Sequence, residues 1–156
     1  MHGKIGNLAI QLMRSLMGVV AGYAAMVFGT TLVQNDLLGG HVSYTHSPSS
    51  ILLVGAILTP LAALLGGFIT GAIAGRAPFA HVMPMCGAIA LETAYFTYVH
   101  RGSDPLWFRA SAALALIVGG LVGAWLWQAI AEMHADTAFP GFNAFGSVLR
   151  NFQKRR

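Results

Sequence analysis

The carboxylate of Glu92 is the side chain with the clearest chemical potential, because it lies inside the apolar stretch Phe79–Val99. No other apolar stretch of crossing length contains Asp or Glu. A charged Asp, Lys or Arg at mid-membrane costs about 2.5–3.5 kcal/mol, so an ionisable residue there is a candidate for moving protons or ions. The alternative is a structural role, in which nearby Tyr95, His100 or Arg101 solvates or pairs the carboxylate.

His81 precedes Glu92 by eleven residues, close to three helical turns, so the two share one helical face. Met85 and Ala88 fall on the same face. Such a stripe suggests a proton path. A neutral imidazole is also an axial ligand for haem iron or for chlorophyll magnesium, which makes His81 a candidate cofactor ligand. A third interpretation is simple solvation, since His81 follows Pro78 near the expected cytoplasmic boundary.

No metal centre or catalytic site is predicted. His41 and His46 lie near Asp36, but two imidazoles at a spacing of five leave a site short of ligands. The single cysteine, Cys86, excludes an intramolecular disulfide and a multi-cysteine metal site. The sequence also lacks a nucleophile elbow, a phosphate-binding loop and an HExxH motif. We therefore expect a protein that is not an enzyme.

Composition places these residues in a membrane protein. Hydrophobic residues make up 56% of the chain and charged residues only 9%, whereas a soluble domain carries about 25% charged residues. The mean hydropathy is +0.65. Net charge is +4, and four of the nine Lys and Arg residues lie between Arg150 and Arg156. This clustering favours an anionic lipid surface over nucleic acid as a partner.

Four stretches reach the length of about 20 residues that a membrane crossing needs. They predict an all-α bundle of four transmembrane helices in residues 1–131, followed by a tail in residues 132–156. The predicted helices are Ser15–Val33, Ser50–Gly75, Phe79–Val99 and Leu106–Ile130.

Small residues recur about every four positions in three of these helices. Such rows let neighbouring backbones approach closely, which in lipid stands in for the hydrophobic effect. We expect the second helix to be the packing spine, with bulky side chains facing lipid or a partner. The predicted packing positions are Gly18, Gly22, Gly67, Gly71, Gly75, Gly119 and Gly123.

The distribution of basic residues predicts the orientation. Seven Lys and Arg residues fall on one side of the predicted helices and two on the other. Because cytoplasmic segments carry the excess, both termini are expected in the cytoplasm. The tail is predicted to form a short interfacial helix or an ordinary basic tail, and in both cases to contact anionic lipid. Its lipid-binding residues would be Arg150, Lys154, Arg155 and Arg156.

The four apolar stretches, the short link at 76–78 and the Ala-Gly-Arg ending of the second stretch resemble small uncharacterised four-helix inner-membrane proteins of bacteria. The resemblance implies the fold and adds no site residue. From the residues, we expect a non-catalytic accessory subunit of a respiratory or photosynthetic complex, packed against other membrane subunits. Chlorophyll or haem shared with those subunits is its candidate cofactor. The alternative is a small oligomeric transporter or proton channel using Glu92, with Tyr95 along the route.

Overall fold

The computed structural model describes residues 2–40, 42–75, 77–99 and 104–137, with side chains from 10 to 133. Four long helices dominate: α1 (His2–Leu32), α2 (Ser49–Ala74), α3 (Pro78–Val99) and α4 (Leu106–Thr137). A π-helical turn, η1 (Val33–Leu37), extends α1. No strand occurs in this described part of the chain. All four helices are long and apolar enough to cross a membrane, which confirms the predicted all-α fold and is consistent with a helical membrane protein.

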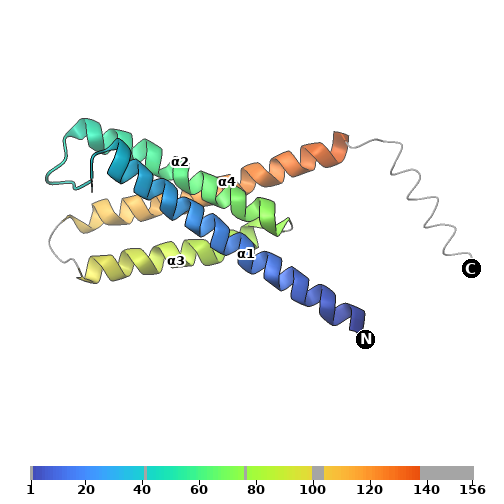
Figure 1. The fold of residues 1–156 in the computed structure, drawn as a ribbon. Helices are drawn as coiled ribbons and strands as arrows, with labels where there is room; N and C mark the ends of the chain where they lie inside the picture. Colours follow the sequence, from blue (N-terminus) through green and yellow to red (C-terminus); the bar gives the residue numbers. More distant parts are fainter. Residues whose placement is uncertain (1, 41, 76, 100–103, 138–156) are drawn as a thin grey trace, which may run out of the picture.

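The helices run back and forth, so α1 begins and α4 ends at the same end of the bundle (Figure 1). We call this the terminal end. The opposite end, the loop end, carries the α1–α2 connection and the α3–α4 connection. At the terminal end α1 and α4 extend past the bundle and diverge. The predicted interfacial helix and its four basic residues lie outside the described residues.

Helix α2 is the centre of the bundle, with its most extensive contacts to α4 and α1. Two rows of small residues on adjacent faces explain this position. Gly22 of α1 lies against Gly66 and the hydroxyl of Thr70. On the other face, Gly67 packs directly on the backbone of Gly120 in α4. A Cβ added to Gly67 or to Gly120 would meet a neighbouring atom. These approaches need residues without bulk.

Six of the seven predicted packing glycines lie at such contacts. In α1, Gly18 faces the carbonyl of Thr70, and in α4, Gly119 and Gly123 face the carbonyls of Pro60 and Leu64. The six are Gly18, Gly22, Gly67, Gly71, Gly119 and Gly123.

Gly75 differs from the other six because α2 ends at Ala74, one residue before the predicted end. Gly75 has a φ of 71°, the left-handed conformation that glycine adopts most easily. Its amide donates to the carbonyl of Gly71 at 2.9 Å. Arg14 reaches the same end of α2, where its guanidinium donates to the carbonyl of Ile73 at 3.3 Å. Gly75 is therefore a helix cap.

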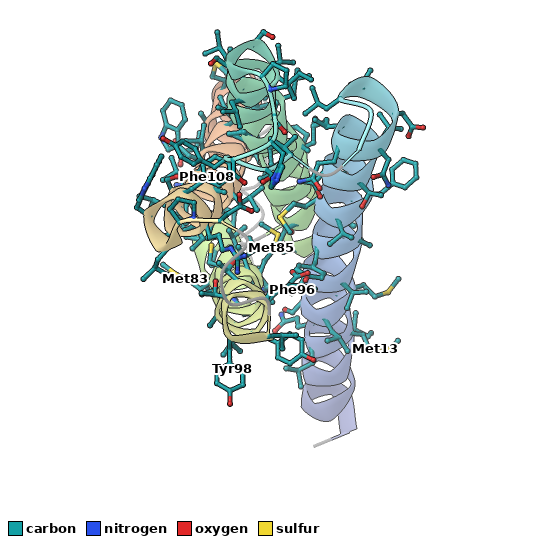
Figure 2. All side chains as sticks on the ribbon, turned by 90° about the vertical axis from the view of Figure 1, so that its left-hand side faces the viewer. Met13, Met83, Met85, Phe96, Tyr98 and Phe108 are labelled. Carbon is teal, nitrogen blue, oxygen red and sulfur yellow. The ribbon has the colours of Figure 1, made fainter. Side chains whose placement is uncertain are left out.

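The core is small and lies where α3 meets the other helices. Val82 and Met85 of α3 are fully buried, together with Ala124 of α4. Figure 2 shows Met85 between the helices, whereas Met13 and Tyr98 point away from the bundle. Thr70, also fully buried, satisfies its hydroxyl by donating to the carbonyl of Gly66. Long apolar side chains on the outer surface are the arrangement expected of helices solvated by lipid.

Candidate functional site

Glu92 is held by a residue of α1 that the sequence analysis did not single out. The hydroxyl of Tyr23 donates to the Oε2 atom of Glu92 at 2.7 Å. Tyr23 lies near the middle of Ile10–Leu37, a segment long and apolar enough to cross a membrane, and Glu92 lies seven residues, about 10 Å, before the end of α3. The carboxylate is thus well inside the apolar length of the bundle. The expected partners His100 and Arg101 lie outside the described residues.

His81 forms a second polar contact between the same two helices. Its Nδ1 atom lies 2.9 Å from the carbonyl of Ala77 and its Nε2 atom 2.7 Å from the hydroxyl of Ser15. A carbonyl oxygen only accepts, so Nδ1 carries the hydrogen, and in the neutral ring Nε2 accepts from Ser15. Axial ligation through Nε2 would therefore require Ser15 to release the imidazole.

The four residues Ser15, Tyr23, His81 and Glu92 define a surface that we call the α1–α3 face. Along α3, His81 and Glu92 are about 16 Å apart, since each residue of a helix rises about 1.5 Å. The fully buried side chain of Met85 and Ala88 occupy the interval between them. The two polar contacts are separate, and the described side chains do not join them into one proton path.

The α1–α3 face is exposed at Glu92. Glu92 is exposed, and Tyr95, one turn further along α3, is 63% exposed. The ring of Tyr95 lies against that of Phe96, with centroids 5.7 Å apart. The structure thus places the carboxylate of Glu92 and the phenol of Tyr95 on the outer surface of α3, where they face the surroundings of the bundle.

The loop end is fixed by Asp104, another residue that the sequence analysis missed. Its Oδ1 atom accepts from the hydroxyl of Ser43 and from the amide of Tyr44, both at 2.8 Å. The ring of Tyr44 also packs edge-on against Trp107, with centroids 4.9 Å apart. These contacts tie the α1–α2 connection to the start of α4.

No metal centre forms among the described residues, within which no three His, Cys, Asp or Glu side chains are grouped closely enough to hold an ion. His41 lies outside that part of the chain. The Nδ1 atom of His46 is 2.7 Å from the hydroxyl of Thr45.

No family model, no curated protein and no solved structure matches this chain.

Proposed function

We propose that the protein is a non-catalytic accessory subunit of a larger membrane assembly and that a partner covers its α1–α3 face. The observation that carries this proposal is the exposure of Glu92 at a depth where the chain is otherwise apolar. Ionisable residues inside membranes almost always face a bundle interior, a cavity or another polar group. Glu92 has the hydroxyl of Tyr23, yet the residue remains open on its outer side.

A partner helix would resolve this arrangement. A carboxylate has two oxygens that accept hydrogen bonds, and Tyr23 donates to one of them, Oε2. A hydroxyl, amide, imidazole or cationic side chain from a neighbouring helix would complete the site. Polar contacts of this kind stabilise helix association in membranes by about 0.6 kcal/mol on average and up to about 1.7 kcal/mol.

We further propose that the assembly is respiratory or photosynthetic and lies in a bacterial inner membrane, with both termini in the cytoplasm. The seven-to-two distribution of basic residues supports the orientation. The basic cluster from Arg150 to Arg156 would then contact anionic lipid at the cytoplasmic surface.

Purification in mild detergent from the native membrane tests the proposal. We expect the wild-type chain to migrate with other membrane polypeptides in constant stoichiometry. Glu92→Gln should release most of the chain from these polypeptides. Glu132→Gln, which alters an exposed carboxylate near the end of α4, should not. A complex that survives Glu92→Gln unchanged would contradict the role of this face.

The exposed carboxylate also favours a second candidate, a homo-oligomeric proton or ion transporter in which copies meet at Glu92. Proton flux in proteoliposomes that disappears in Glu92→Gln, from a preparation containing only this polypeptide, would support the transporter. The separation of Glu92 from His81 makes it the weaker candidate, because a proton route would need groups from another copy.

A further inference from the structure

A groove of about 830 Å³ lies between α3 and α4 on the outside of the bundle, away from the α1–α3 face. Half of its lining residues are alanines and threonines, and its volume falls within the range of about 300–1,000 Å³ that is typical of ligand pockets. In the α2–α4 contact, small residues bring two backbones together. Here they leave space between two helices. The lining alanines are Ala90, Ala94, Ala110 and Ala113.

The groove has the depth of one membrane leaflet. On α4 its lining runs from Leu106 to Ile117, a rise of eleven residues or about 16.5 Å. On α3 it covers Ala90 to Tyr98, which is eight residues or about 12 Å. One leaflet accounts for about 15 Å of a hydrocarbon core about 30 Å thick. The space therefore suits an acyl chain that enters from the loop end.

The mouth of the groove carries charges of both signs. Arg109 and Asp104 line it at the loop end, where the guanidinium of Arg109 also donates to the carbonyl of Phe96 at 3.3 Å. Trp107, 57% exposed, lies at the same level, as expected for a residue of the membrane interface. Arginine binds phosphate through two parallel hydrogen bonds, and a carboxylate attracts an ammonium group.

We propose that the α3–α4 groove binds one zwitterionic phospholipid of the phosphatidylethanolamine type. One of its two acyl chains lies between the alanines of α3 and α4, its phosphate contacts Arg109, and its ammonium group lies on the side of Asp104. This site is independent of the partner proposed for the α1–α3 face, since the two are lined by different residues.

Native mass spectrometry tests the site. The full chain is purified in micelles that contain equal amounts of phosphatidylethanolamine, phosphatidylglycerol and diacylglycerol. We expect one phosphatidylethanolamine to stay bound after the detergent is removed. Ala94→Leu and Ala110→Leu, on opposite walls, should each abolish this retention by filling the groove. Ala112→Leu, exposed on α4 but outside the groove lining, should preserve it.

Arg109→Gln tests the recognition of phosphate. A hydrogen bond to a charged group raises affinity about tenfold or more. The affinity of the variant for phosphatidylethanolamine should therefore fall by about that factor, and the variant should retain this lipid no better than diacylglycerol. Arg14→Gln, which alters an arginine at the opposite end, should retain the lipid. Circular dichroism checks that each variant is folded.

Three results would overturn the proposal. The first is equal retention in the groove-filling variants and in Ala112→Leu. The second is equal binding of diacylglycerol and phosphatidylethanolamine by the wild-type chain. The third is a dimer that the groove-filling variants dissociate, which would identify a second copy of this chain as the occupant.

Discussion

At the scale of single residues, the hydrogen bond between Tyr23 and Glu92 connects two helices that otherwise make limited contact. Tyr23→Phe removes the donor and keeps the ring. We expect the free energy of unfolding in bicelles to fall by about 0.6–1.7 kcal/mol. Tyr95→Phe is the matched control, because the described contact of Tyr95 is made by its ring and survives the substitution. Equal losses in the two variants would show that the Tyr23 hydroxyl has no special role.

The imidazole of His81 provides a second test at this scale. Its contact with the Ala77 carbonyl requires the hydrogen on Nδ1, and in the neutral ring Nε2 then accepts from Ser15. We expect the nitrogen chemical shifts of the purified protein to show this tautomer, and Ser15→Ala to move the Nε2 resonance most. An absorption band of haem or chlorophyll that disappears in His81→Ala would instead establish the cofactor role considered from the sequence.

Sequence reasoning located Glu92 and His81 but not their partners. Both were identifiable because an ionisable group in an apolar stretch is conspicuous along one chain segment. Tyr23 and Ser15 are ordinary residues for a membrane helix, and what selects them is the way α1 crosses α3. Spacing along one helix cannot predict that crossing. Asp104 escaped notice for the same reason, since its partners Ser43 and Tyr44 belong to a distant connection.

At the scale of helices, the α2–α4 contact depends on glycines that meet backbone. A Cβ at Gly67 would overlap the carbonyl of Gly120, and neither backbone can move without separating the helices. We expect Gly67→Ala to lower the free energy of unfolding by about 1–3 kcal/mol. Gly71→Ala should cost less, because the added Cβ would lie 2.9 Å from an atom of the Trp127 side chain and not against backbone. Chemical unfolding in micelles measures both.

Gly87 provides the control, because a Cβ added there meets nothing within 4 Å. Gly87→Ala should leave stability unchanged or raise it slightly, since alanine favours a helix. If Gly67→Ala and Gly87→Ala behaved alike, the close approach of α2 and α4 would not contribute to stability.

Much of the helical framework was predictable because apolar length and small-residue spacing are properties of one segment at a time. The second row of small residues on α2, which faces α1, was not predicted. It includes Thr70, whose hydroxyl is satisfied inside its own helix and so costs nothing to bury. The end of α4 was placed too early, at Ile130. Hydropathy falls there, but the helix continues to Thr137, and Gln128 donates to Glu132 across one turn at 2.8 Å.

At the scale of the whole molecule, the two ends of the bundle should face opposite compartments. His46→Cys at the loop end and Glu132→Cys at the terminal end replace exposed residues. We expect an impermeant thiol reagent to label the first from outside the cell and the second only from the cytoplasmic side. Cys86 is buried, so the background should be low. The reverse pattern would invert the proposed orientation.

Site-specific photocrosslinking in the native membrane shows directly whether a partner covers the α1–α3 face. A photoreactive residue at Tyr95, 63% exposed beside Glu92, is compared with one at Leu53 of α2, 64% exposed. We predict that position 95 yields one defined adduct with another membrane polypeptide, that Glu92→Gln diminishes this adduct, and that position 53 does not form it. Lipid adducts alone at both positions would show that lipid, and not a partner, covers the α1–α3 face.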